Sequence, residues 1–285
     1  MSLEDRVSSL EKIKISLRHR LPNIPKDNFI EFNRWLGNPF HPKLRRETDI
    51  FPFQIKMRDA IREHRRVIVN KFTGAGGTEM IPRIFLEMML TDELPFKQFA
   101  IVTGLRMKFT EQVIQDRVKN IITTKHPELI RYAVKDTIEL QNGTYFRGYP
   151  TDHIDTIRGQ DDIMGIFIDE AAFFHLNDQQ ELRTAIERYI LKTNPYIIWL
   201  STPNGQQGAF YNIWSDAIKQ QNDYVPIIIP YSEGIECHLL DSIEIEKKKR
   251  DRYFSQEYNN QFLAPQGAIM SPIREEQMTL KEEIL

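Results

Sequence analysis

Short apolar runs alternate with longer helix-like stretches through most of this chain, and that alternation limits the folds it can adopt. The apolar runs lie at 67–69, 99–103, 166–169, 196–201 and 225–229. The helix-like stretches between most of them lie at 79–91, 107–123, 178–192 and 207–221. Strands that alternate with helices form βαβ crossovers and a mostly parallel sheet, buried on both faces. The sequence therefore predicts an α/β fold with one mostly parallel sheet flanked by helices.

Two local features modify this parallel scheme. Pro226 has no N–H to donate within a sheet, so the run that contains it is predicted to be an edge strand at best. Asn142-Gly143 is a typical hairpin turn, and the segment Thr137–Gly148 is therefore predicted to be a β-hairpin inserted into the scheme.

The two ends of the chain differ from this central region. Apolar residues recur at three- and four-residue steps over residues 1–21, which predicts an amphipathic helix. Prolines interrupt the next stretch, which also carries several aromatic residues and is predicted to be an irregular segment packed on the core. Residues 240–262 are predicted to form a final long polar helix. The predicted organisation is an N-terminal helix and irregular extension at 1–44, an α/β domain at 45–270, and a tail or linker at 271–285.

Composition excludes several classes of protein. The chain has 285 residues, of which 41% are hydrophobic, so it can bury a sizeable core. Its apolar runs are far too short to cross a bilayer, and its acidic N-terminus does not resemble a signal peptide. A single cysteine excludes an internal disulfide. The net charge of −2 does not indicate a nucleic-acid-binding protein, although a motor that grips DNA transiently needs few phosphate contacts. The dense basic segment at 247–252 is either such a contact or a solvated helix face.

The apolar run at 166–168 ends in two adjacent carboxylates, Asp169 and Glu170. That is the form of a Walker B element in a P-loop ATPase. In such an element the first acid holds the Mg²⁺ shell and the second orients the water that attacks the γ-phosphate. We therefore predict Asp169 as a metal-binding residue and Glu170 as a catalytic residue.

A glycine-rich turn follows the apolar run at 67–69 and opens a helix-like stretch, as a phosphate-binding loop requires. Gly74, Gly76 and Gly77 let backbone N–H groups approach the phosphates, and the hydroxyl of Thr78 is predicted to bind Mg²⁺. Gly77 stands where the usual P-loop has its lysine. Lys71 occupies the first position of the same frame, and its long flexible side chain could reach the β- and γ-phosphates. A glycine-rich turn without a ligand is the alternative interpretation. The 91 residues from Thr78 to Asp169 leave room for a βα unit and a hairpin, after which the two strands that carry these residues are predicted to meet side by side.

Two further segments extend this nucleotide site. Ser201 and Thr202 follow the apolar run at 196–201, and we predict that they face the γ-phosphate and sense its hydrolysis. Phe53 and Gln54 precede the phosphate loop, and an aromatic ring with an amide can recognise adenine by stacking and by pairing. The alternatives are a plain Pro-Asn-Gly turn for the first segment, and core aromatics with a surface glutamine for the second.

These four elements occur in an order that resembles the ATPase domain of the large terminase subunit of tailed bacteriophages and related viruses. They are Phe53-Gln54, the Walker A variant Lys71–Thr78, the Walker B segment Ile168–Phe173, and the coupling motif Ser201–Gly205. Thr156–Gly159 and the stretch from Gln256 to Ala268 are similar to further passages of that family. The resemblance covers roughly residues 45–270, and the ordered set is far more specific than any one motif.

The resemblance implies a RecA-like P-loop fold of the ASCE class and an ATP- and Mg²⁺-dependent motor that translocates double-stranded DNA into a preformed capsid. The implied partners are the DNA, the portal protein, the small terminase subunit and further copies of the chain in a homo-oligomeric ring. The implied location is the cytoplasm of the infected host cell, with no membrane contact.

Residue roles carry over from the family onto matching positions. The phosphate-binding lysine carries over to Lys71, the Mg²⁺ ligands to Thr78 and Asp169, and the catalytic glutamate to Glu170. An arginine finger that acts between neighbouring subunits is expected, with Arg158 as the candidate and Arg106 in reserve. A structural ion pair is the alternative for either arginine.

Two departures from the family pattern keep other interpretations open. The absence of lysine at position 77 allows a non-hydrolysing nucleotide-binding assembly module. The chain also ends soon after residue 270, so the family's RNase H-like nuclease domain is not expected here, and it was either removed or lies on another chain. A superfamily 2 helicase shares these motifs, but it would need a second RecA-like domain after Gly205.

Overall fold

The computed structural model describes residues 23–94, 97–104, 107–151 and 154–264. The helix predicted over 1–21 and the tail predicted over 271–285 lie outside the described residues.

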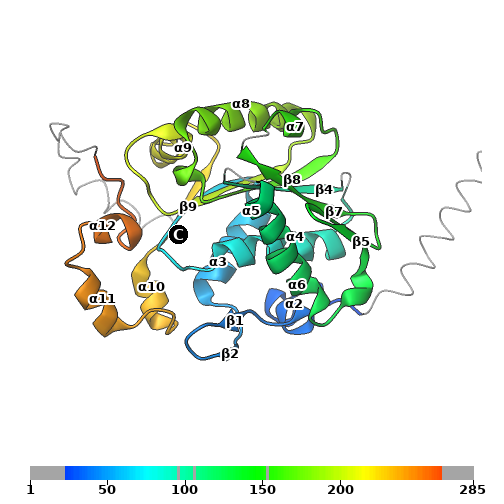
Figure 1. Ribbon diagram of the computed structural model, residues 1–285, viewed down its shortest axis with the longest axis horizontal. Helices are drawn as coiled ribbons and strands as arrows, with labels where there is room; N and C mark the ends of the chain where they lie inside the picture. The colour runs from blue at the N-terminus through cyan, green and yellow to red at the C-terminus, as the bar shows by residue number, and fades with distance from the viewer. Residues whose placement is uncertain (1–22, 95–96, 105–106, 152–153, 265–285) are drawn as a thin grey trace, which may run out of the picture.

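The centre of the molecule is an eight-stranded sheet with the order β10-β3-β9-β8-β4-β7-β6-β5 (Figure 1). Its strands are β3 (Arg66–Lys71), β4 (Gln98–Thr103), β5 (Ile130–Val134), β6 (Thr137–Leu140), β7 (Tyr145–Pro150), β8 (Ile163–Asp169), β9 (Tyr196–Ser201) and β10 (Val225–Ile229). The six strands from β10 to β7 run parallel, while β6 is antiparallel to both of its neighbours. The predicted mostly parallel α/β fold is confirmed.

The hairpin and the edge strand are confirmed as well. β6 and β7 form the hairpin predicted around Asn142-Gly143, and β10 with its proline lies at one edge of the sheet. β5 is an additional antiparallel strand for which the sequence carries no strand signal. Its residues are mostly exposed or half-buried, so it lacks the apolar run that marks the central strands.

One prediction about strand order is wrong. The spacing between the two halves of the nucleotide site was expected to let β3 and β8 pair side by side, but β9 lies between them. β9 pairs in parallel with both strands, and this register aligns the carboxyl ends of all three. Sequence spacing shows that strands can meet, but it does not show which strand inserts between them.

Helices cover both faces of the sheet (Figure 1). One face carries α2 (Phe29–Leu36), α3 (Pro52–Glu63), α4 (Gly77–Thr91), α5 (Met107–Gln112), the π-helix η1 (Val113–Lys119) and α6 (Asn120–Thr123). The other face carries α7 (Asp155–Arg158), α8 (Leu176–Lys192) and α9 (Gly208–Ile218). A separate C-terminal group contains α10 (Tyr231–Glu236), α11 (Ser242–Lys248) and α12 (Phe254–Glu257). None of the helices among the described residues combines the length and apolar character needed to cross a membrane.

The sheet separates two hydrophobic cores. Along β3, Val67 and Val69 face the core beneath α4, whereas Ile68 faces the core beneath α8 and α9. Because side chains alternate along a strand and both faces are covered, almost every residue of the central strands is buried. This explains why those strands are continuous apolar runs in the sequence.

Two local predictions need correction. The proline-rich segment before residue 44 contains the helix α2, because Asn28 caps its N-terminus by accepting hydrogen bonds from the N–H groups of Ile30 and Glu31. The region 240–262 forms the short helices α11 and α12 in place of one long helix. Within α11 the buried residue is Ile245, so this segment lacks the apolar stripe that stabilises a long surface helix.

A candidate nucleotide site at the carboxyl ends of the strands

The predicted site residues meet where β3, β9 and β8 end. Lys71, Ser201 and Asp169 are the last residues of these three strands, and the strand register sets Asn70 beside Ser201 and Leu200 beside Asp169. In open α/β sheets, ligands bind outside the carboxyl ends of the strands. The fold therefore brings the predicted Walker A, Walker B and coupling segments into one row.

Lys71 connects all three segments. Its side chain is 5% exposed, and its Nζ lies 2.7 Å from Oε1 of Glu170 and 3.3 Å from Oγ1 of Thr202. A buried ammonium group is stable only when it is paired and hydrogen-bonded. Lys71 therefore fixes the relative positions of the Walker B glutamate and the coupling motif.

Glu170 has an unusual backbone conformation. Its φ of 51° and ψ of 42° lie in the left-handed region, which is uncommon for a residue with a side chain. Such conformations cluster at functional sites, where surrounding contacts hold them. Here the N–H of Ala172 donates to Oγ of Ser201 at 3.1 Å, and Nδ2 of Asn204 donates to the carbonyl of Ala172 at 3.1 Å. The coupling motif thus holds the turn that presents Glu170.

Asp169 is a buried carboxylate, and its Oδ1 has no hydrogen-bond partner among the described residues. Burial raises the pKa of Asp169 to about 7, the neighbouring charge of Glu170 adds to that rise, and the Thr78 hydroxyl and the charge of Lys71 oppose it. An unpaired carboxylate oxygen beside a hydroxyl is a donor set that suits Mg²⁺.

The donor set for this ion is incomplete without water or phosphate. In the part of the chain that the structure describes, no group of three or more His, Cys, Asp or Glu side chains gathers to hold a metal. Mg²⁺ commonly uses one or two protein oxygens and takes its other ligands from water and phosphate. Asp169 and Thr78 therefore fit the ion that the sequence predicts.

The glycine-rich turn has the geometry that its residues require. Gly74 and Gly76 have φ values of 92° and 78°, which side chains rarely tolerate, and α4 begins at Gly77. The N-terminus of a helix attracts anions because its first N–H groups are free and its dipole is positive. A Cβ added at Gly77 would lie 2.5 Å from Cδ1 of the buried Leu200. A side chain at position 77 would therefore require Leu200 to shift.

A cavity of about 480 Å³ extends from this row of residues. Its lining comes from the phosphate loop with Lys71 and Glu170, and from the short hairpin formed by β1 (Phe40–His41) and β2 (Arg46–Glu47). The lining residues include Pro39, Phe40, His41, Thr48, Phe51, Gln54, Lys71, Gly74, Gly76, Gly77, Thr78, Glu79, Arg117, Glu170 and Leu239. The volume is in the usual range for sites that hold small ligands.

The predicted adenine side of the cavity is only partly as expected. Gln54 lines the cavity and is buried, and its Oε1 accepts a hydrogen bond from the N–H of Phe51 at 3.0 Å. This leaves its amide N–H groups near Gly76. Phe53 packs against Phe51 and Phe72 inside the core and does not line the cavity. Its position argues against the predicted base contact, because Phe53 lies on the inner face of α3.

Three cavity residues were not found from the sequence. Phe40 is 59% exposed and offers an aromatic ring, and His41 is buried with no partner at Nε2 among the described residues. The aromatic content of this segment was a usable signal, but it was interpreted as core packing. Arg117 lies on the π-helix η1, where wider turns shift the direction of side chains, so regular helical spacing could not place it.

The remaining predicted residues lie around the cavity rather than in it. Ser201 and Thr202 contact Ala172 and Lys71 and are not among the cavity lining. Arg158 lies on α7, which follows β7, two strands beyond β8. It is 39% exposed, and its Nη1 lies 2.8 Å from Oδ1 of Asp155. The structure therefore does not bring Arg158 to the cavity of its own chain, and Arg106 lies outside the described residues.

Comparison with known proteins found a matching family and several structures with a similar fold. A family model described as terminase large subunit, T4-like-virus type, N-terminal, matches residues 84–276. No curated protein sequence matches the chain.

Several solved structures share the fold. A variant of the large terminase ATPase domain of Thermus phage P74-26 is 16% identical, with a TM-score of 0.58, and the match covers 82% of this chain and 98% of that one. The large terminase of bacteriophage HK97 is 13% identical, with a TM-score of 0.63, and 84% of this chain matches 55% of that one. The large terminase of a thermophilic bacteriophage in complex with ADP is 12% identical, with a TM-score of 0.57, over 75% of this chain and 54% of that one. This chain therefore spans about half the length of the latter two proteins.

Proposed function

The chain belongs to the terminase large subunit family, T4-like-virus type, and we propose that its α/β domain hydrolyses ATP to drive the packaging of double-stranded DNA into a viral capsid. The observation that carries this proposal is the contact of Lys71 with both Glu170 and Thr202, beside the buried Asp169. These contacts join a phosphate-binding loop, a water-activating acid and a coupling segment at one cavity.

We propose that ATP occupies the cavity with its phosphates at the glycine-rich loop. The N–H groups at the start of α4 would bind the phosphate oxygens, and the amide of Gln54 would contact the base. Asp169 and Thr78 would hold Mg²⁺, which when bound neutralises charge that develops on the phosphates during transfer. The neighbour that was solved with ADP supports nucleotide binding in this fold.

Glu170 is the proposed general base. Its carboxylate lines the cavity and is 43% exposed, so it can accept a hydrogen bond from a water molecule and orient that water for attack on the γ-phosphate. Lys71 has three N–H donors, of which two point to Glu170 and Thr202. The third donor is available to a phosphate oxygen. One ammonium group can therefore contact a phosphate, the proposed general base Glu170 and the coupling motif together.

This arrangement gives hydrolysis a direct route to the coupling motif. When the γ-phosphate leaves, Lys71 loses a partner and its contact with Thr202 changes. Ser201 and Asn204 are hydrogen-bonded to Ala172 and so hold the turn after Glu170. A movement of the loop that follows β9 would therefore also move Glu170. We propose that the loop carries the signal of hydrolysis toward the DNA.

We further propose that Arg158 acts on the nucleotide of a neighbouring subunit. Its exposure and its distance from the cavity of its own chain, two strands away from β8, suit a residue that works between subunits. A ring of such subunits would act with the portal protein and the small terminase subunit in the cytoplasm of the infected host cell.

The proposal is tested by comparing ATP hydrolysis of the parent chain with that of Glu170→Gln, across a range of protein concentrations. We expect the variant to bind ATP while hydrolysis falls at least about a hundredfold, because general-base catalysis contributes roughly 10²–10⁴-fold. Glu139→Gln is the matched control, since that carboxylate pairs with Arg131 at the far end of the sheet. Hydrolysis that persists unchanged in Glu170→Gln would exclude the proposed mechanism.

A further inference from the structure

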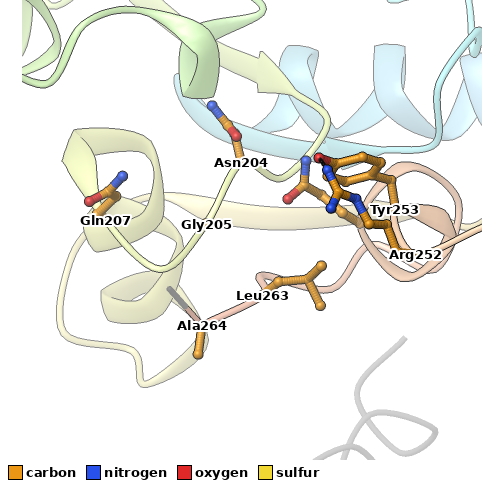
Figure 2. Close-up of a pocket in the computed structure, with 8 residues that line it drawn as sticks. Asn204, Gly205, Gln207, Arg252, Tyr253, Leu263 and Ala264 are labelled. Atoms are coloured by element: carbon orange, nitrogen blue, oxygen red, sulfur yellow. Dashed lines mark hydrogen bonds between the residues drawn. The ribbon is translucent and has the colours of Figure 1, made fainter. Parts of the chain in front are cut away.

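A second cavity, of about 320 Å³, lies behind the coupling motif (Figure 2). One wall is the loop that follows β9, and the other is the segment around α12. The lining residues are Asn204, Gly205, Gln207, Arg252, Tyr253, Gln256, Leu263 and Ala264. In Figure 2, Arg252 and Tyr253 stand side by side on the opposite side of the cavity from Gln207.

Each wall of this cavity is hydrogen-bonded to a different half of the nucleotide site. Asn204 in the first wall donates to the carbonyl of Ala172, which lies two residues after the proposed catalytic glutamate. In the second wall, the carbonyl of Glu257, next to Gln256, accepts from the N–H of Thr73 in the phosphate loop at 2.8 Å. A group bound between these walls would therefore touch one segment attached to Walker B and one attached to Walker A.

The lining favours an anion. Among the described residues that line the cavity, none carries a carboxylate, and the polar groups are one guanidinium, three side-chain amides and a phenol. Arg252 is exposed, and its guanidinium contacts the hydroxyl and the ring of Tyr253. The nearby carboxylate of Asp251 accepts a hydrogen bond from the N–H of Tyr253.

Two further cations extend the positive surface away from the cavity. Lys248 and Arg250 are exposed, and within the described ranges neither they nor Arg252 has a carboxylate at ion-pair distance. The neighbouring Lys247 and Lys249 are instead paired with Glu244 and Glu246. Unpaired cations beside amide donors are the groups that most often contact the phosphates of nucleic acids.

We propose that this cavity binds a phosphate of the double-stranded DNA backbone, with Arg252 as the main contact and Lys248 and Arg250 on adjacent phosphates. The inference rests on the proposed packaging function, which supplies the DNA. Of the two interpretations of the basic segment at 247–252, the proposal selects a contact with DNA over a solvated helix face. Because both walls are attached to the nucleotide site, a change at Lys71 and Thr202 would alter the distance between the groups that hold the phosphate. The grip on DNA would then depend on the bound nucleotide.

The test measures binding of a fluorescent 30-base-pair duplex by anisotropy at several salt concentrations. The proteins are the full chain and its variants Arg252→Ala, Gln256→Ala and Arg188→Ala. Arg188 is the matched control, because it is also an exposed arginine near the ring of the tyrosine that follows it, on α8. Thermal unfolding of each variant verifies that it is folded, and Gln256→Ala provides a second, uncharged probe of the same cavity.

We expect Arg252→Ala to weaken binding about fivefold to tenfold and to lower the slope of log K against log salt by about one, as loss of one phosphate contact predicts. Gln256→Ala should weaken binding about threefold, and Arg188→Ala should leave it unchanged. Equal affinities for the parent and both cavity variants would overturn the assignment. So would the same slope of log K against log salt in Arg252→Ala and the parent.

A separate arm distinguishes backbone phosphate from free phosphate. Inorganic phosphate is added at constant ionic strength, and chloride serves as the comparison. If phosphate binds to the parent and not to Arg252→Ala while DNA affinity is equal in both, then the cavity holds a free phosphate and the DNA assignment is wrong. A parent chain that binds no duplex at all would contradict the packaging function itself, which separates the two failures.

Discussion

Both ends of the sheet are built from β-strands, but only one end carries the proposed nucleotide site. From β3 to β4 the strands are parallel and almost wholly buried, and their carboxyl ends carry the proposed catalytic residues. From β7 to β5 the strands form antiparallel pairs, and β5 is largely exposed. Parallel strands end at one edge, so their last residues converge, whereas a hairpin sends successive ends in opposite directions. The comparison indicates that substitutions of one chemical type should cost far more at the parallel end.

Core truncation should show the largest difference. Phe167 on β8 is fully buried, and we expect Phe167→Ala to lower the free energy of unfolding by about 3–5 kcal/mol through lost burial and cavity formation. Tyr132 on β5 is 52% exposed, and Tyr132→Ala should cost less than about 1 kcal/mol. Denaturant unfolding measures both values. Equal losses would show that the two ends of the sheet are equally packed.

Glycine replacement should give the next largest contrast. A Cβ at Gly77 would lie 2.5 Å from the buried Leu200, so Gly77→Ala should destabilise the fold by about 1–3 kcal/mol. Gly159, beyond the end of β7, has nothing within 4 Å of an added Cβ and a negative φ, and Gly159→Ala should change the free energy of unfolding by less than about 0.5 kcal/mol. Thermal unfolding of the two variants provides the comparison, and a neutral Gly77→Ala would show that Leu200 shifts without cost to admit a side chain at that position.

The smallest contrast concerns a single hydroxyl. Thr202→Val removes the acceptor of Lys71, and because a hydrogen bond contributes roughly 0.5–1.5 kcal/mol, ATP turnover should fall about threefold to tenfold. Thr137→Val, at the antiparallel end, removes a hydroxyl that donates to Asp136 and should leave turnover unchanged. Steady-state hydrolysis at saturating ATP distinguishes them. Full activity in Thr202→Val would show that the contact of Lys71 with the coupling motif does not contribute to hydrolysis.

The sequence predicted the parallel end better than the antiparallel end, for physical reasons. Continuous apolar runs mark strands that are buried on both faces, so the central strands and the residues at their ends could be located. β5 has no such run. The position of β9 between β3 and β8 could not be inferred either, because strand order depends on packing of the helices that connect the strands.

The site shows the same division. Lys71, the glycines of the loop, Asp169 and Glu170 lie together as predicted, because each follows directly from the end of a buried strand. Their functional roles stay predictions. The predicted adenine side of the cavity depends on a loop and on one face of α3. There the sequence predicted a contact from Phe53, whereas the structure places Phe40 and Phe51 along the cavity. Arg117 depends on a π-helix, for which regular helical spacing gives no signal.

The central claim is that Lys71 takes the role of the P-loop lysine, which position 77 lacks. It is tested most directly by the rate of ATP hydrolysis of Lys71→Ala beside the parent, with the exposed Lys97→Ala as a control at the hairpin turn. We expect the rate of Lys71→Ala to fall at least about a hundredfold, since this side chain contacts the proposed catalytic glutamate and lines the cavity proposed to hold the phosphates. Lys97→Ala should keep the parental rate. If Lys71→Ala hydrolyses ATP as fast as the parent, the lysine has no catalytic role and the account of the site is wrong.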